Sequence, residues 1–425
     1  MAPLNFADQP MALVRELRRG GLDIRHLNYS ADGRHPLGYE LDWAVKVSDL
    51  DTSTQLEVLQ QCLEQDFDIY HFWQRSLVFN RQLDGLSGID LPILKAQGAT
   101  IFHRFTGLDL RMSQQDLAFN PFSPFRFGFE NPFDESRQQE YLEFLNSYVD
   151  RFFVQDPELL QFMPDATVLP RGLALDEWQF VGVERTDKPL IVHAPTNPAV
   201  KGSSMIVAAL ETLSREKTGF EYKILEGVSH EEARQWYEKA DIVIDQILIG
   251  ATGVLTLEAW ALGKPCVTYL REDLFTPFYG TSTLPVANAN PDTIESTLRK
   301  LITDYDWREQ LSAQGRETVE KYHDIREIAR DYREIVGQHI AAPRTTGKSS
   351  NVPEFLSSGI RLQGSRTPAR AFGGENAVRG NAVATFFARV IRCQEWLFDH
   401  LISWQIRLVR LILHLKTKAT RDSRG

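Results

Sequence analysis

The stretch Asp241–Pro265, which reads DIVIDQILIGATGVLTLEAWALGKP, decides the fold of this chain. It opens with an apolar run that ends in Asp245 and continues through a loop that contains Gly250 and Gly253. An apolar helical run follows, and the sequence Gly-Lys-Pro stops it. The order of strand, glycine turn, helix and stop is typical of one repeating unit of an α/β fold.

The start of this helix is a candidate anion site. Amides in the first helical turn have no partner within the helix, and the helix dipole favours negative charge there, so a phosphate binds well. Glu258 lies one turn further on and could accept the hydroxyls of a ribose beside that phosphate. The pattern indicates a nucleotide site. The alternatives that the glycines are plain turn residues and that Glu258 only faces the helix dipole stay open.

Strand-like and helical segments alternate along two stretches of the chain. The expected strands include Ile69–Trp73, Thr100–Phe105, Arg151–Val154 and Cys266–Tyr269. This pattern predicts an α/β protein with two doubly wound, Rossmann-like domains that face a cleft, where ligands bind at the carboxyl ends of the strands. We predict these boundaries: an N-terminal domain at 1–176, a C-terminal nucleotide-binding domain at 177–316, a helix that returns to the first domain at 317–340, a linker at 341–381 and a basic amphipathic helix at 382–418.

Two parts of the N-terminal half do not follow the alternation. A doubly wound domain should open with a strand, yet the chain begins with MAPLNFADQP, which looks like a loop. Either Met1–Asn5 forms a stub of that strand, or the natural start lies a few residues further upstream. We favour the second alternative, because a sheet without this strand would lack its middle. The aromatic segment Arg111–Pro132 is predicted to be irregular and to lie over the cleft.

Composition narrows the class of protein. The net charge of −10 argues against a protein that coats nucleic acid. The three cysteines lie far apart and show no disulfide or metal-ligand spacing, which is typical of the reducing cytoplasm. No secretory signal is visible, and no apolar run reaches the roughly 20 residues that span a bilayer. Asp49-Leu50-Asp51 resembles a metal-binding motif but lies outside the nucleotide-binding half, so we predict no metal and no cofactor.

The last part of the chain differs in charge. Residues 341–425 hold 14 Lys and Arg against 5 Asp and Glu, whereas the rest holds 33 against 52. The segment 382–418 combines a broad apolar helical face with basic residues. Two interpretations stay open: the helix lies on an anionic membrane surface, or it packs as a coiled coil or on a partner protein. The first, which we favour, places a cytoplasmic protein on the inner face of the membrane.

Three motifs resemble a known family. His193–Gly202 (HAPTNPAVKG), Gly227–Ala233 (GVSHEEA) and Gly253–Pro265 are similar, in order and spacing, to the nucleotide-sugar half of GT-B glycosyltransferases, above all the retaining family 4. Asn5–Gly21 and His103–Arg111 (HRFTGLDLR) match the acceptor-side loops more weakly. The resemblance spans Pro3–Ile340 and leaves out the tail.

The resemblance implies an enzyme that moves a sugar from a nucleotide-diphosphate sugar to a glycan or lipid-linked acceptor in polysaccharide or glycolipid synthesis. It implies retention at the anomeric carbon, and charge stabilisation by the protein rather than by a metal. Lys201 would pair with the diphosphate, Glu258 would hold the ribose, and His103 would lie at the catalytic centre. The implied donor-binding residues are Thr196, Asn197, Lys201, Gly227, Val228, Ser229, Gly253, Val254, Leu255, Thr256 and Glu258, and the acceptor-side candidates are Asn5, Asp109 and Arg111.

The chain also departs from the family. Gly250 stands where the family places a glutamate that grips the transferred sugar, with Asp245 or Gln246 as possible substitutes, and an arginine ahead of Lys201 is missing. These departures support a rival hypothesis, a catalytically impaired scaffold that binds a nucleotide sugar or assembles with other proteins. A further rival is another GT-B enzyme, such as an epimerase or a phosphorylase.

Simple structural roles compete with the functional ones for single residues. Taken alone, Lys201 could be a solvated lysine and His103 a buried structural histidine. Asp109 and Arg111 could pair with each other, which we favour slightly over acceptor binding. His71 is expected in the core.

Overall fold

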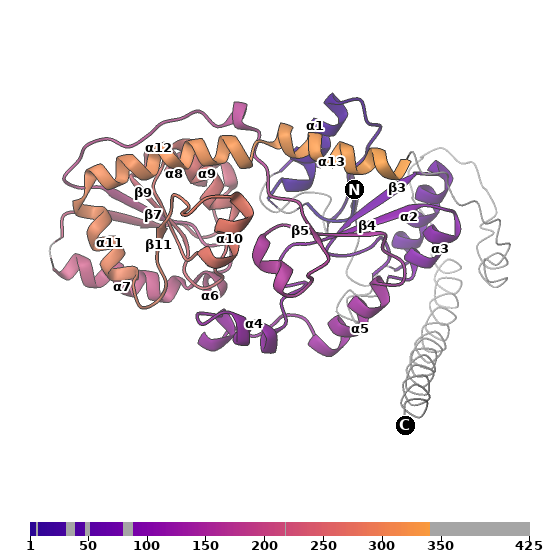
Figure 1. Ribbon diagram of the computed structural model, residues 1–425, viewed down its shortest axis with the longest axis horizontal. Helices are drawn as coiled ribbons and strands as arrows, with labels where there is room; N and C mark the ends of the chain where they lie inside the picture. The colour runs from indigo at the N-terminus through magenta and orange to yellow at the C-terminus, as the bar shows by residue number, and fades with distance from the viewer. Residues whose placement is uncertain (6, 31–38, 47–51, 80–87, 217, 341–425) are drawn as a thin grey trace, which may run out of the picture. The chain divides into compact units, whose positions relative to one another are not determined.

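The computed structural model describes residues 1–340 apart from 6, 31–38, 47–51, 80–87 and 217. The expected linker at 341–381, the expected helix at 382–418 and Asp49-Leu50-Asp51 therefore lie outside the described residues. All described residues belong to one compact unit, Met1–Leu356. This unit is an α/β structure of parallel sheets with many helices, as predicted (Figure 1).

The C-terminal half holds a five-stranded parallel sheet in the order β11-β10-β9-β7-β8. Its residues alternate between two faces: Val192 and Val243 point to one apolar cluster, whereas Ile191 and Ile242 point to another. Both faces are thus covered, as in a doubly wound domain. The strands are β7 (Leu190–His193), β8 (Glu221–Ile224), β9 (Ile242–Gln246), β10 (Cys266–Thr268) and β11 (Ala287–Asn288).

Helices from different parts of the sequence cover these two faces (Figure 1). One face packs against α8 (His230–Lys239), α9 (Val254–Leu262) and α10 (Glu272–Tyr279). The other packs against α7 (Ser203–Arg215) and α11 (Ile294–Thr303), and α12 (Tyr305–Tyr322) contributes side chains to both.

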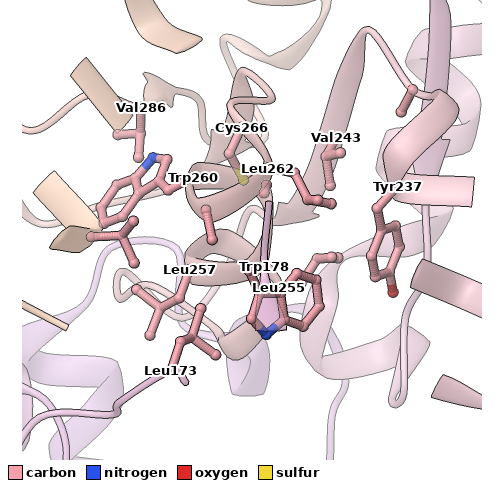
Figure 2. Close-up of a cluster of buried hydrophobic side chains, with 14 of the residues drawn as sticks. Leu173, Trp178, Tyr237, Val243, Leu255, Leu257, Trp260, Leu262, Cys266 and Val286 are labelled. Atoms are coloured by element: carbon pink, nitrogen blue, oxygen red, sulfur yellow. The ribbon is translucent and has the colours of Figure 1, made fainter. Parts of the chain in front are cut away.

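Helix α9 lies inside the first of these clusters (Figure 2). All its residues from Leu255 to Leu262 are buried, which explains why its sequence is apolar on every side. The Trp260 ring packs within the cluster, and its Nε1–H donates to the Pro285 carbonyl at 3.0 Å. Gly263 ends the helix at φ +71°, a conformation that favours glycine. The position of the helix start is therefore fixed by the core.

The N-terminal half holds a four-stranded parallel sheet in the order β3-β4-β5-β6, beside a parallel pair β1-β2. The strands are β1 (Leu27–Ser30), β2 (Trp43–Lys46), β3 (Ile69–Trp73), β4 (Thr100–Phe105), β5 (Arg151–Val154) and β6 (Thr167–Val168). The helices along this half are α1 (Gln9–Arg19), α2 (Thr52–Gln65), α3 (Asp90–Ala96), α4 (Ser113–Phe119) and α5 (Glu135–Leu145).

The first residues take the place of the expected opening strand. Ala2 exchanges backbone hydrogen bonds with β3, through the His71 carbonyl at 3.1 Å and the Trp73 amide at 2.8 Å. On the other side, the Met1 and Pro3 carbonyls accept from amides of β1 at 2.9 and 2.8 Å. Residues Met1–Pro3 therefore lie between β1 and β3, as in the less favoured alternative of a strand stub.

One predicted helix is divided. The sequence pattern favours a single helix at 317–340, but α12 runs to Tyr322 and a separate helix, α13 (Ile325–Ile340), follows the break. At the break, the His323 carbonyl accepts from the Leu173 amide at 2.8 Å. Helix α13 packs against α1 and against residues of β4 and β5, so the return of the chain to the N-terminal half begins at 325. The domain boundaries themselves stay predictions.

The prediction also missed short elements. Strands β2 and β11 and helix α10 were not expected, and the segment expected to be irregular contains α4 and the 3₁₀ turn Pro124–Phe127. These elements are two to eight residues long, too short for a clear apolar period.

Candidate functional site

The side chain of Asp245 organises the start of α9. Asp245 is the fourth residue of β9 and is 0% exposed. One of its carboxylate oxygens accepts from the Gly253 amide at 2.8 Å and from the Thr256 hydroxyl at 2.6 Å. The other pairs with the ammonium of Lys201. Burial opposes ionisation of this carboxyl, but the charge and hydrogen bond of Lys201 outweigh burial, and the pKa of Asp245 is lowered.

Lys201 is placed by its backbone as well as by Asp245. It ends the short helix α6 (Pro198–Lys201), in which the Asn197 side chain accepts from the Val200 amide at 3.3 Å. The Lys201 carbonyl accepts from the Ile247 amide in the loop after β9 at 3.0 Å. The ammonium therefore lies at the start of α9, beside the Asp245 carboxylate and not out in solvent.

The amides of the first turn of α9, those of Val254, Leu255 and Thr256, have no hydrogen-bond acceptor among the described residues. The amide of Gly253, which was predicted to bind phosphate, is already bonded to Asp245, and the Thr256 side chain is buried against the same carboxylate. An anion at this helix start would therefore meet the amides of 254–256 and the Lys201 ammonium.

Glu258 is joined to the loop predicted to line the base pocket. Its Oε1 lies 2.7 Å from Nε2 of His230, the first residue of α8. Burial favours the neutral imidazole, but the hydrogen bond and charge of Glu258 outweigh it and raise the pKa of His230. Ser229 caps α8 by accepting from the Glu232 amide at 3.2 Å. The segment Gly227–Ser229 directly precedes the residue that bonds Glu258, and its role in binding the donor stays a prediction.

Aromatic rings surround His230. The Tyr39 ring lies 5.0 Å from the His230 ring and the Trp178 ring lies 6.0 Å from it, centroid to centroid. Asp8 is close enough for its charge to act on His230, and the Asn5 amide lies 3.4 Å from an oxygen of Asp8. The predicted acceptor-side residue Asn5 is thus connected through Asp8 to the surroundings of Glu258.

The N-terminal half contacts the loop between β9 and α9 directly. The buried Asn120 side chain donates to the carbonyls of Leu248 at 2.7 Å and Ile249 at 3.3 Å. Arg171 donates to the Thr252 carbonyl at 3.0 Å. Asn120 lies in the segment predicted to cover the site, and this loop is where the two halves meet.

A buried network of charges supports Arg171. Arg171 pairs with Asp156 at 2.5 Å, and Arg111 pairs with Glu158. Burial raises the pKa of Glu158 to about 7 despite Arg111, and the charge of Asp156 adds to the rise. Among the described residues, Oε2 of Glu158 and Oδ2 of Asp156 have no hydrogen-bond partner. The network lies at the carboxyl ends of β4 and β5 and reaches the loop before α9 through Arg171.

The prediction for His103, which lies in β4, is wrong. His103 was predicted at the catalytic centre, but it is fully buried among Phe105, Tyr141 and Phe152, and burial lowers its pKa to about 3. Its ring nitrogens have no hydrogen-bond partner among the described residues, so it is a core residue on the sheet face away from the charges. His71 is buried as expected and bonds the Tyr332 hydroxyl at 2.7 Å.

The favoured Asp109–Arg111 ion pair is also wrong. Asp109 instead accepts from the amides of Thr106 and Gly107, at 2.9 and 2.6 Å, and closes the turn after β4. Arg111 turns to Glu158 because that carboxylate is buried beside it.

Asp245 and Gln246, the proposed substitutes for the missing glutamate, both form hydrogen bonds with the loop between β9 and α9. Asp245 binds the start of α9, and Gln246 accepts from the Ile249 amide at 2.8 Å and donates to the Ala251 carbonyl. Gly250 itself has φ +80°. Thr196 and Asn197 are exposed on the loop before Lys201.

Residues that the sequence reasoning missed share one signal. Asp156, Glu158 and Arg271 each follow a predicted strand within a few residues, at the sheet edge where ligands bind. Arg171 and Asn120 have no such signal, because both reach the site through long-range contacts.

No family model and no curated protein matches this chain. Solved structures do match it. A sucrose-phosphate synthase from Thermosynechococcus elongatus is 14% identical, with 78% of this chain and 92% of that chain covered and a TM-score of 0.54. HepE from Anabaena, in complex with UDP and glucose, is 10% identical over 79% of this chain and 98% of that chain, with a TM-score of 0.52. The chain has the GT-B fold.

An apo structure of OtsA also supports the GT-B assignment. It is 10% identical over 79% of this chain and 97% of that chain, with a TM-score of 0.51. At such identities the likeness shows the fold and not the substrate. In the part of the GT-B chain that the structure describes, no helix combines the length and apolar character needed to cross a membrane.

Proposed function

We propose that this GT-B chain is a glycosyltransferase that moves a sugar from a nucleotide-diphosphate sugar to an acceptor hydroxyl. The observation that supports this most is the meeting of Lys201, the open amides of α9 and the Glu258–His230 pair at the carboxyl edge of one sheet. These groups match a donor in order: base and ribose beside His230 and Glu258, then diphosphate at the helix start.

The charged and polar groups at the start of α9 suit the departure of the diphosphate. As the bond between the sugar and the diphosphate breaks, negative charge grows on the diphosphate, and Lys201 with the α9 amides would stabilise it without a metal. The acceptor oxygen forms the new bond to the sugar as the bond to the diphosphate breaks, and its proton passes to the departing diphosphate. The resemblance to family 4 extends the proposal to retention at the anomeric carbon, which an NMR assignment of the product tests.

A thermal-shift and calorimetric screen of nucleoside diphosphates tests donor binding. We expect one diphosphate to stabilise the protein by mass action. Glu258→Gln should weaken that binding by about 10- to 100-fold, because a charged acceptor for the ribose hydroxyls is lost. Binding of inorganic pyrophosphate, which has no ribose, should not change. The exposed Glu231→Gln on α8 is the matched control.

The wild type and the Glu258→Gln variant also distinguish the transferase hypothesis from the scaffold hypothesis. Release of the nucleoside diphosphate from its sugar donor, lost in Glu258→Gln, supports the transferase. Tight donor binding without any release, across neutral and charged sugars, supports the catalytically impaired scaffold instead. If no diphosphate binds, the proposed function is wrong.

We further propose that the basic segment 382–418 binds an anionic membrane surface, which would suit a lipid-linked acceptor. The support is its sequence, with Trp396 and Trp404 among apolar residues at helical spacing and Arg407 and Arg410 among its cations. The full chain should float with vesicles that contain phosphatidylglycerol, and less with pure phosphatidylcholine. A chain without 382–425 should not float, and equal flotation of both chains would end the membrane proposal.

A further inference from the structure

The space beside Gly250 is filled by Arg271, which follows β10 and caps the start of α10. Its φ of +80° favours glycine, and a Cβ built there would lie 2.8 Å from Cγ and 3.1 Å from Cδ of Arg271. The Arg271 amide also donates to the Gly250 carbonyl at 3.0 Å. A glutamate at 250 would therefore need both an unfavourable backbone and the space of the arginine. In this chain the aliphatic part of the Arg271 side chain therefore occupies the space that a side chain at position 250 would need.

The guanidinium of Arg271 lies where the two halves meet. One nitrogen donates to Oε1 of Gln161 at 3.0 Å and another to the Asp273 carboxylate at 2.9 Å. The Arg271 side chain is 15% exposed, whereas Asp273 is 63% exposed. An exposed carboxylate partner is held weakly, so a second carboxylate can take its place. Arg271 also lies close enough for its charge to act on the buried Asp116 carboxyl, whose pKa it lowers against the effect of burial.

If the chain binds a nucleotide-diphosphate sugar as proposed above, the order base, ribose, diphosphate and sugar along that donor places the sugar near Arg271. Ribose at Glu258 and diphosphate at the first turn of α9 lead away from α8 and toward the loop that precedes α9. Gly250 lies in that loop, three residues before the Gly253 cap, and Arg271 covers it. A guanidinium offers a planar fork that fits a carboxylate with two parallel hydrogen bonds.

We propose that Arg271 selects a donor whose sugar carries a carboxylate, that is, a uronic acid. The guanidinium keeps its contact with Gln161 and exchanges the solvent-exposed Asp273 for the sugar carboxylate. The site would then prefer a charged sugar over its neutral parent, which differs only at C6.

Matched pairs of donors test this proposal by calorimetry. The pairs are UDP-glucose with UDP-glucuronate, UDP-galactose with UDP-galacturonate, and GDP-mannose with GDP-mannuronate. For at least one pair, the uronate should bind wild type about 10-fold or more tightly than the neutral sugar. Arg271→Gln should reduce this ratio to about one and leave the affinity for the nucleoside diphosphate alone unchanged. Asp273→Asn is the control and should keep the preference.

Arg271→Lys guards against a folding defect, since it keeps the stem over Gly250 and the charge but loses the fork. It should bind the uronate with a preference between those of wild type and Arg271→Gln. Equal binding of each pair by wild type overturns the proposal, as does a preference that survives Arg271→Gln. In both cases the diphosphate alone still binds, so the proposed function stands. Failure of every diphosphate to bind counts against the proposed function instead.

Discussion

Lys201→Met is expected to weaken the binding of a nucleoside diphosphate by about 100-fold, measured by calorimetry at neutral pH. The ammonium is held at the start of α9, where the amides of 254–256 have no partner among the described residues. A charge-assisted contact between an ammonium and a phosphate is about twice as strong as a neutral hydrogen bond. Inorganic pyrophosphate should lose as much affinity as the nucleotide, which distinguishes this variant from Glu258→Gln.

The same substitution should also destabilise the protein. Asp245 is 0% exposed, and without Lys201 its carboxylate is buried with only the Gly253 amide and the Thr256 hydroxyl as partners. Removing one partner of a buried ion pair costs about 3–5 kcal/mol of unfolding free energy. The lowered pKa of Asp245 gives stability that is present above its unfolded pKa and lost as the pH falls through its folded pKa. Lys201→Met should remove much of that acid dependence.

A second variant separates binding from stability. The double variant Lys201→Met/Asp245→Asn has no unpaired charge, so its unfolding free energy in urea should recover most of the loss. Its affinity for the diphosphate should stay low. Asp245→Asn alone keeps the ammonium and should bind the diphosphate at least as tightly as wild type. Diphosphate binding by the double variant at wild-type strength would show that Lys201 does not hold the ligand.

The sequence predicted the repeating part of the fold because that part is periodic. Ile69–Trp73 and Thr100–Phe105 were predicted with the bounds that the structure has, since short apolar runs between polar turns are typical of buried parallel strands. The division of the last helix at His323 was missed because the helical period continues across it. The break depends on a backbone bond to Leu173, a contact between distant residues that no local pattern contains.

The contrast between local patterns and long-range contacts also explains which parts of the candidate site could be predicted from the sequence. Lys201, Glu258 and the start of α9 could be proposed from the sequence because a glycine turn and a helix start are local features. Their roles in binding stay predictions. The roles of His103 and Arg111 were misassigned because their partners are set by the fold: one lies in an aromatic core and the other reaches Glu158 on the next strand. Arg271 was missed although Gly250 pointed to a change there, because only the structure shows which side chain fills the space.

Arg111→Met is the substitution expected to reduce stability most in the N-terminal half. Arg111 and Glu158 are both almost fully buried and pair directly. Without the guanidinium, the Glu158 carboxylate would lie beside Asp156 with no counter-charge of its own, at a cost of about 3–5 kcal/mol in unfolding free energy at about pH 8. Lys95→Met is the surface control, because Lys95 and Asp150 are 33% and 34% exposed and their pair is worth about 0–1 kcal/mol.

The loss in Arg111→Met should depend on pH. Burial raises the pKa of Glu158 to about 7, against Arg111. A carboxyl whose pKa is raised on folding contributes stability that is complete below its unfolded pKa and lost as the pH rises through its folded pKa. Removing Arg111 raises the folded pKa further, so the carboxyl stays protonated to higher pH and the deficit shrinks in acid. Urea unfolding at about pH 5.5 should therefore show a smaller loss than at about pH 8.

The variant Arg111→Met/Glu158→Gln decides whether this pair is the cause. A neutral amide needs no counter-ion, so the double variant should be more stable than Arg111→Met at about pH 8 and should lose the pH dependence of the deficit. An equal deficit at both pH values in Arg111→Met would mean that lost packing of the arginine stem, and not the unpaired carboxylate, sets the cost. Because Asp156 joins this network to Arg171 and Arg171 bonds the Thr252 carbonyl, the charge at Glu158 is also connected to the loop before α9.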